Sequence, residues 1–118
     1  MKIIPDVHPI LLQFSLFFHK WADEFYYKGD NLNCVLSSDL VFGYFLEANP
    51  QFRQWIKKRA FKKELLDYVK LKKLVFNPWQ MDKDDKTIRY KGLEYYHVCT
   101  KEWGKRSKNR NYDYIKVL

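Results

Sequence analysis

Apolar side chains recur every three or four positions between residues 9 and 27, and this spacing predicts an amphipathic helix. Pro9 suits the first position of such a helix, and Gly29 is a natural stop after its end. Bulky aromatic residues dominate the stripe, which is more typical of a helix face buried in a core than of a ligand site. The apolar positions are Ile10, Leu11, Phe14, Phe17, Phe18, Trp21 and Phe25.

A short strand and a second helix are expected next. Residues 33–36 form a brief apolar run that is compatible with a strand. Ser37 or Ser38 can then cap a helix over about residues 39–48, because a serine hydroxyl accepts a hydrogen bond from the first turn. Pro50 ends this helix, since proline disfavours the helical conformation of the residue before it. The expected apolar face comprises Leu40, Val41, Tyr44 and Phe45.

Residues 51–73 do not fit a single helix. The apolar face of the first part would continue onto charged residues, and a second apolar series is out of phase with it. The pattern therefore predicts a short helix over about residues 50–57 and a longer one over about residues 59–72, with a break near residues 58–60. The longer helix would turn Phe61, Leu65, Tyr68 and Val69 inward.

Strands are expected in the last third of the chain. Residues 74–78 and 87–90 are typical of two strands joined by a polar loop near Trp79–Lys86. The second strand would continue past a kink or bulge at Gly92 as far as Cys99. A basic, flexible loop over residues 100–111 and a last strand over residues 113–118 complete the pattern.

The order of these elements predicts the fold. Two helices, a basic third helix and a hairpin follow one another as they do in a winged helix. We therefore expect an α+β fold, a winged helix-turn-helix with an N-terminal aromatic helix and a C-terminal β-hairpin. With no internal repeat and no long linker, residues 1–118 should form a single winged-helix-like domain.

The charge is unevenly distributed. Lys and Arg total 22 against 14 Asp and Glu, for a net charge of +8. Residues 1–50 carry three lysines and six acids, a net charge of −3, whereas residues 51–118 carry 19 basic and 8 acidic residues, a net charge of +11. A basic half of this strength favours a polyanionic partner, nucleic acid or an anionic membrane surface, although many small basic proteins bind neither.

Two basic segments are candidates for contacts with nucleic acid. The longer helix would present cations opposite its apolar face, as a recognition helix does, although a solvated lysine face has the same pattern. The loop over residues 100–111 can lie along a phosphate backbone, or can be a flexible end that contacts nothing. The candidates are Arg59, Lys62, Lys63, Lys70 and Lys73 on the helix, and Lys105, Arg106, Lys108 and Arg110 in the loop.

Motifs for catalysis or metal binding are not recognisable. The two cysteines and three histidines lack the paired spacing of a zinc site, and the four glycines are isolated, so that no phosphate-binding loop is expected. If Cys34 lies on a strand paired with the strand that ends at Cys99, the two thiols would be neighbours. We expect no cofactor, no enzymatic activity of the chain itself, no membrane contact and a cytoplasmic location with reduced thiols.

Four segments together resemble a known family. They are Ser37-Ser38-Asp39-Leu40, the run from Ala60 to Tyr68, the run from Leu74 to Pro78, and Glu94-Tyr95-Tyr96. Over about residues 35–98 this succession resembles the winged-helix domain at the C-terminal end of phage- and plasmid-type primase–helicases, the virulence-associated-protein-E-like replication proteins. The resemblance implies a DNA-binding module for replication of a mobile element, with Arg59, Lys62, Lys63 and Lys70 on the DNA-reading helix. The chain has no Walker motif and no primase acids, so it corresponds either to an excised domain or to a small free-standing protein.

Three hypotheses about function follow. The first is a winged-helix module that binds DNA, duplex more than single-stranded, beside a helicase or primase partner. The second is a protein–protein interaction module of the same fold without intrinsic DNA binding. The aromatic first helix would then provide an exposed patch that contacts the partner. The third is a small phage enzyme or inhibitor whose site has no recognisable motif.

Overall fold

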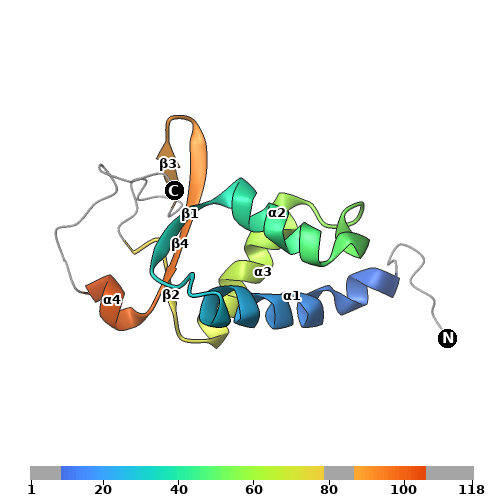
Figure 1. Ribbon diagram of the computed structural model, residues 1–118, viewed down its shortest axis with the longest axis horizontal. Coiled ribbons are helices and arrows are strands. Elements are labelled where there is room, and N and C mark those ends of the chain that lie inside the picture. The colour runs from blue at the N-terminus through green and yellow to red at the C-terminus, as the bar shows by residue number, and fades with distance from the viewer. Residues whose placement is uncertain (1–8, 79–86, 106–118) are drawn as a thin grey trace.

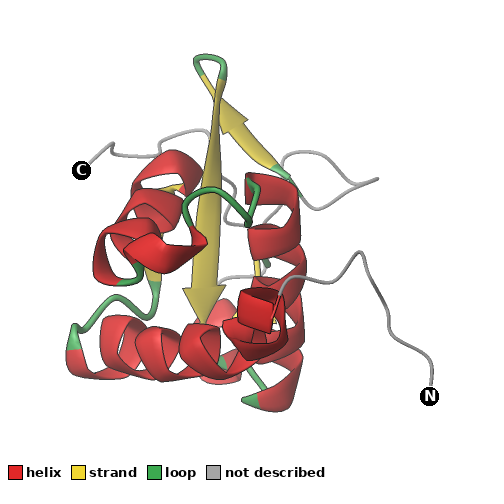
Figure 2. Ribbon diagram, turned by 90° about the vertical axis from the view of Figure 1, so that its right-hand side faces the viewer, coloured by secondary structure: helices red, strands yellow, loops and turns green. Residues whose placement is uncertain are grey.

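The computed structural model describes residues 9–78 and 87–105 and has an α+β fold of helices and one small antiparallel sheet (Figure 1). The helices pack together beside the sheet, and the hairpin projects away from them (Figure 2). In chain order the elements are η1 (Pro9–Gln13), α1 (Phe14–Ala22), η2 (Asp23–Lys28), β1 (Cys34–Ser37), α2 (Ser38–Ala48), η3 (Pro50–Phe52), α3 (Lys58–Leu71), β2 (Val75–Phe76), β3 (Ile88–Tyr90), β4 (Leu93–Cys99) and α4 (Lys101–Lys105).

The aromatic N-terminal helix is confirmed, although its winding changes along its length. It begins as a 3₁₀ turn in η1, continues as α-helix in α1 and ends as π-helix in η2. A π turn is wider than an α turn, so the residue that follows Trp21 on the buried face is Tyr26 and not Phe25 as predicted. Phe25 instead lies half-buried with its ring stacked on that of Trp21, at 4.8 Å between centroids.

Helix α2 begins where the serine pair predicts. Ser37 is the N-cap residue, and its Oγ accepts a hydrogen bond from the backbone N–H of Leu40 at 3.4 Å. The predicted apolar face is only half correct, because Val41 and Phe45 are fully buried while Leu40 and Tyr44 remain 42% and 46% exposed. Leu40 and Tyr44 lie on the flank of α2 that faces η2, beside the core-facing stripe.

The predicted separation into two elements is confirmed, but the predicted position of the break near residues 58–60 was wrong. Instead of a helix over residues 50–57, the chain forms only the 3₁₀ turn η3, which buries Phe52, and a non-helical stretch over residues 53–57, which buries Ile56; α3 begins at Lys58. The four residues predicted to face inward from α3 are all buried, namely Phe61, Leu65, Tyr68 and Val69. The helix ends in a Schellman motif, in which Leu74 N–H donates to Val69 C=O at 2.9 Å and Lys73 N–H donates to Lys70 C=O at 3.1 Å.

The sheet is built around β4. Strand β1 pairs antiparallel with one edge of β4, with Cys34 opposite Val98 and Ser37 opposite Tyr95. Because β1 occupies that edge, β2 and β3 share the other one, β2 beside Val98 and Cys99 and β3 beside residues 93–95. The order helix, strand, helix, helix, strand, hairpin is compatible with a winged helix.

The predicted hairpin was wrong in its pairing. Strands β2 and β3 do not pair with each other, and the chain does not continue through Gly92 as one kinked strand. It reverses at Lys91 and Gly92, whose φ angles of 51° and 80° fit the tight two-residue turn of a β-hairpin. The polar loop Trp79–Lys86, predicted to join the two strands of the hairpin, and the predicted strand over residues 113–118 lie outside the described residues.

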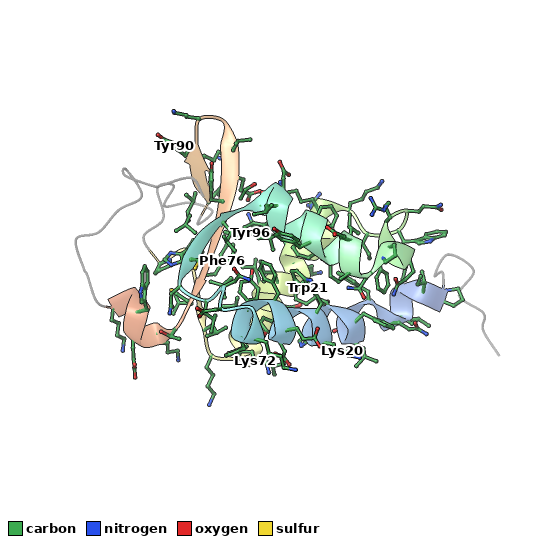
Figure 3. All side chains as sticks on the ribbon, viewed as in Figure 1. Lys20, Trp21, Lys72, Phe76, Tyr90 and Tyr96 are labelled. Carbon is green, nitrogen blue, oxygen red and sulfur yellow. The ribbon has the colours of Figure 1, made fainter. Side chains whose placement is uncertain are left out.

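The core lies between α1, α2, α3 and one face of the sheet. Phe18 is its centre, since its ring is within 6.0 Å of the rings of Phe45, Phe61 and Tyr68. From the sheet, Tyr96 contacts Phe76 at 5.6 Å between ring centroids (Figure 3), and both belong to the same buried cluster. Alternate residues of β4 therefore face the helices, and the residues between them face the opposite side.

The start of the predicted flexible loop is a helix. Residues 101–105 form α4, in which Trp103 N–H donates to the hydroxyl of Thr100 at 3.2 Å. Trp103 packs edge-to-face on His97 at 4.8 Å, so α4 covers the sheet face that points away from α3. The prediction of a loop fails here because Thr100 can cap a helix and Trp103 has a buried surface to contact, which the composition of the segment does not reveal.

Candidate nucleic-acid interface

Three of the predicted cations form a stripe on α3. Arg59, Lys63 and Lys70 are exposed and lie within about 40° of one another at 100° per residue, on the side opposite the buried face. Leu66, 39% exposed, lies between them at the intervening turn. None of the three cations forms an ion pair with any residue that the structure describes. Their charge is therefore directed at solvent and is available to a polyanion.

Lys62 does not belong to this stripe. Its Nζ lies 2.8 Å from Oε2 of Glu94 on β4, and both side chains are partly buried. Lys58, one turn earlier, is paired with Asp39 on α2 and lies 3.9 Å from the other oxygen of Glu94. The predicted contact of Lys62 with DNA is replaced by an ion pair that holds the hairpin against the first half of α3.

Lys73 lies just beyond the helix. It occupies the C′ position of the Schellman motif with a φ of 58°, where glycine is the commonest residue. The 14 residues of α3 span about 21 Å, so Lys73 and Arg59 mark opposite ends of one exposed basic face. Lys73 is exposed, as predicted.

The hairpin tip adds basic residues that the sequence analysis missed. Arg89 and Lys91 are exposed, and Lys91 Nζ lies 5.4 Å from the centroid of the Tyr90 ring (Figure 3). Because Glu94, two residues after the turn, pairs with Lys62, the hairpin lies beside the N-terminal half of α3 and its tip extends beyond the helix (Figure 2). The signal was the dipeptide Lys91-Gly92 between two apolar runs, which we interpreted as a kink instead of a turn.

Lys105 does not lie on this face. Lys105 is exposed at the end of α4, which covers the sheet face away from α3. Arg106, Lys108 and Arg110 lie outside the described residues. Of the nine predicted residues, the structure brings Arg59, Lys63, Lys70 and Lys73 together.

The cysteines offer no reactive centre. In the register of β1 and β4, Cys34 is opposite Val98, so Cys99 lies one position further and its side chain points to the other face of the sheet. The predicted neighbouring thiols are therefore not neighbours, and both are free. Burial raises the pKa of the Cys99 thiol to about 11, which keeps it protonated and unreactive near neutral pH.

Within residues 9–78 and 87–105, no group of three or more His, Cys, Asp or Glu side chains is arranged to hold a metal ion. In the same part of the chain, no helix combines the length and apolarity that crossing a membrane requires.

Comparison with protein-family models, with curated proteins and with solved structures found no match to this chain.

Proposed function

We propose that the chain is a DNA-binding winged-helix module in which α3 is the recognition helix. The observation that carries this proposal is the exposed stripe of Arg59, Lys63 and Lys70, opposite a face that is wholly buried. A helix held in this way can enter a major groove, where guanidinium and ammonium groups reach phosphates and guanine edges. The hairpin tip beside it would contact the flanking backbone through Lys91.

The Lys62–Glu94 ion pair gives the proposed interface its shape. It joins the first half of α3 to β4 two residues after the turn, and so fixes the hairpin relative to the helix. A rigid pair of elements can contact two neighbouring stretches of backbone with little loss of conformational entropy on binding. The pair therefore contributes to DNA binding by positioning the hairpin and not by touching phosphate.

From the resemblance to primase–helicase C-terminal domains we infer the setting of this activity. The module would hold origin or template duplex DNA next to a helicase or primase during replication of a mobile element. The geometry of α3 supports duplex over single-stranded DNA, because the described face presents a convex helix and exposed cations instead of a channel lined by stacking aromatic rings.

A salt titration of duplex binding tests the proposal. Each phosphate contact contributes about −0.9 to the slope of log K against log salt concentration. Replacement of Arg59, Lys63 and Lys70 by Ala should make the slope shallower by about 2.7. Between 50 and 200 mM salt, the affinity of the variant should therefore fall by about 40-fold less than that of the unmodified chain. Affinity at low salt should fall as well, measured by fluorescence anisotropy with duplex and single-stranded probes of one sequence.

A matched variant separates the site from the overall charge. Lys20, Lys28 and Lys101 are exposed cations outside the α3 face, and their replacement by Ala removes the same charge. This control should keep most of the duplex affinity and the slope. If the two triple variants behave alike, or if the unmodified chain binds weakly and without salt dependence, α3 is not a recognition helix and the protein-interaction hypothesis is favoured.

A further inference from the structure

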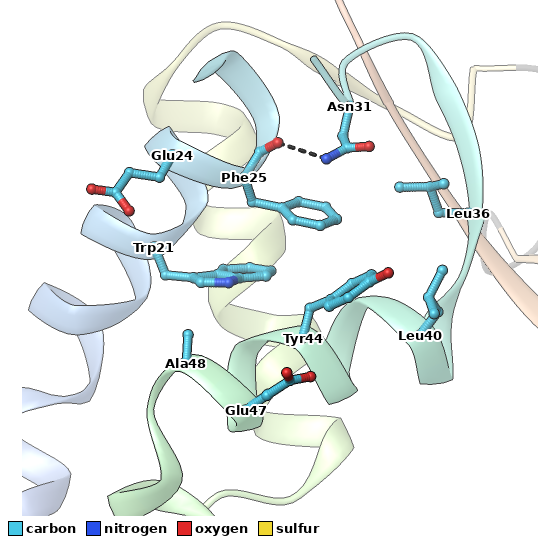
Figure 4. Close-up of a pocket in the computed structure, with 9 residues that line it drawn as sticks. All are labelled: Trp21, Glu24, Phe25, Asn31, Leu36, Leu40, Tyr44, Glu47 and Ala48. Carbon is cyan, nitrogen blue, oxygen red and sulfur yellow. Dashed lines mark hydrogen bonds between the residues drawn. The ribbon is translucent and has the colours of Figure 1, made fainter. Parts of the chain in front are cut away.

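A second surface lies on the other side of the helices. An open groove of about 810 Å³ runs between η2 and α2 and reaches β1 at one end, and α3 lies behind it (Figure 4). The groove is distinct from the basic face of α3. Beneath the groove, Trp21 and Phe45 pack against the buried side of α3, and the basic face is on the opposite side of that helix. Its lining consists of Trp21, Glu24, Phe25, Asn31, Leu36, Leu40, Tyr44, Glu47 and Ala48.

The floor of the groove is aromatic and partly open to water. Phe25 stacks on Trp21 and lies 5.8 Å from Tyr44 between ring centroids. Asn31 Nδ2 donates to the backbone carbonyl of Phe25 at 2.8 Å and fixes this end of η2. Leu40 extends the apolar surface beyond Tyr44. A preformed apolar hollow of this kind can receive large side chains without rearrangement.

The charge of the groove is opposite to that of α3. Among the described residues, its lining includes two acids, Glu24 and Glu47, and no base, and both of these residues are exposed at the rim (Figure 4). Lys20 lies in the adjoining hollow beyond Glu24. The N-terminal 50 residues that build the groove carry a net charge of −3. Phosphates would be repelled here, whereas a cationic and apolar segment would be complementary in both respects.

We propose that this groove is the docking site for a basic amphipathic helix of a partner protein. Apolar side chains three or four residues apart would enter the hollow between Phe25, Leu40 and Tyr44, as in other helix-in-groove complexes. Lysine or arginine side chains on the flank of that helix would pair with Glu24 and Glu47. Since α3 faces the other way, the module can hold DNA and this partner together, and the docking does not depend on DNA binding.

Selection from a library of displayed random 16-residue peptides tests this docking. The full chain is the bait, and selected peptides are synthesised and titrated by calorimetry. We expect them to carry several Lys or Arg residues with apolar residues at spacings of three and four. Tyr44→Ala should weaken their binding by about tenfold or more, the loss expected for an aromatic anchor. Tyr27→Ala is the matched control, because Tyr27 lies on η2, is 47% exposed against 46% for Tyr44 and does not line the groove, and it should leave binding unchanged.

Charge reversal tests the second half of the proposal. Glu24→Lys with Glu47→Lys should reduce peptide affinity by about tenfold or more, whereas Glu102→Lys on α4 should not. Thermal unfolding of every variant checks that the fold is kept. The proposal is overturned if selection yields no binder, or if the binders tolerate Tyr44→Ala or carry no positive charge. It is equally overturned if sedimentation shows a dimer of this chain that Tyr44→Ala dissociates, because a second copy then occupies the groove.

Discussion

Burial of His97 should make this protein less stable at mildly acidic pH. The side chain is fully buried in β4 on the sheet face that α4 covers, with the Trp103 ring 4.8 Å away. Burial disfavours the imidazolium ion and lowers the pKa of His97 from its ordinary value of 6.5 to about 4. Near neutral pH the ring is therefore neutral in both the folded and the unfolded chain.

The sign and the size of the effect follow from that difference. Between the two pKa values the unfolded chain binds a proton that the folded chain does not, so the free energy of unfolding falls as the pH falls through this window. The difference between 6.5 and about 4 corresponds to about 3 kcal/mol in total. Most of it, about 2 kcal/mol, should be lost between pH 7 and pH 4.5.

Urea unfolding at several pH values, in parallel with a His97→Phe variant, measures this contribution. Phenylalanine keeps an aromatic ring against Trp103. The main chain of residue 97 donates its N–H to Asn77 Oδ1 and accepts from the Asn77 N–H, both at 2.8 Å, and neither hydrogen bond needs the imidazole. The variant should lack about 2 kcal/mol of the pH dependence between pH 7 and pH 4.5, whatever its stability at pH 7. Equal pH dependence of the two proteins would refute the argument that His97 is buried and neutral.

Two further predictions concern α3. Tyr68 donates a hydrogen bond from its hydroxyl group to Asp23 at 2.7 Å. Burial raises the pKa of the Asp23 carboxyl, but the hydrogen bonds and charge supplied by Tyr68 and Lys72 outweigh burial, so the pKa of Asp23 is lowered. Tyr68→Phe should therefore lower the free energy of unfolding by about 1–2 kcal/mol in urea titrations, and an unchanged value would mean that this hydrogen bond contributes nothing. Lys63→Ala should weaken duplex DNA binding and reduce the magnitude of its salt slope by about one. Lys62→Ala should leave the slope nearly unchanged, because Lys62 is already paired with Glu94. Equal changes of slope in the two variants would contradict the ion pair.

The helices were predictable because their causes are local. The buried face of α3 follows from Phe61, Leu65, Tyr68 and Val69 at helical spacing, and the start of α2 follows from a serine that can cap it. The inward residues leave Arg59, Lys63 and Lys70 on the outside by the same periodicity. The basic stripe on which the proposed function depends was therefore visible in the sequence.

The details of strand pairing depend on contacts between distant segments. The sequence around Val75 does not indicate that its partner is Cys99 and not a residue of β3. The pairing depends on which strand can lie beside β2 once the helices have packed. The π turn of η2, which exchanges Phe25 for Tyr26 on the buried face, depends likewise on the space beside Tyr68 and Tyr96. A helical period read from sequence assumes one winding throughout, so it could not show this exchange.

The sequence by itself determined which residues are apolar at helical spacing, and with them the aromatic core, the break before α3 and the uneven charge. Only the tertiary structure decided which charged side chains are held in ion pairs and which are exposed to a binding partner. Lys62 and Lys63 are adjacent in the chain and chemically identical, yet one is held by Glu94 and the other faces solvent, because β4 packs beside only one flank of α3. It also decided that Phe25, Leu40 and Tyr44 would line an acidic groove instead of completing the core, because side chains can be buried only where another element covers them.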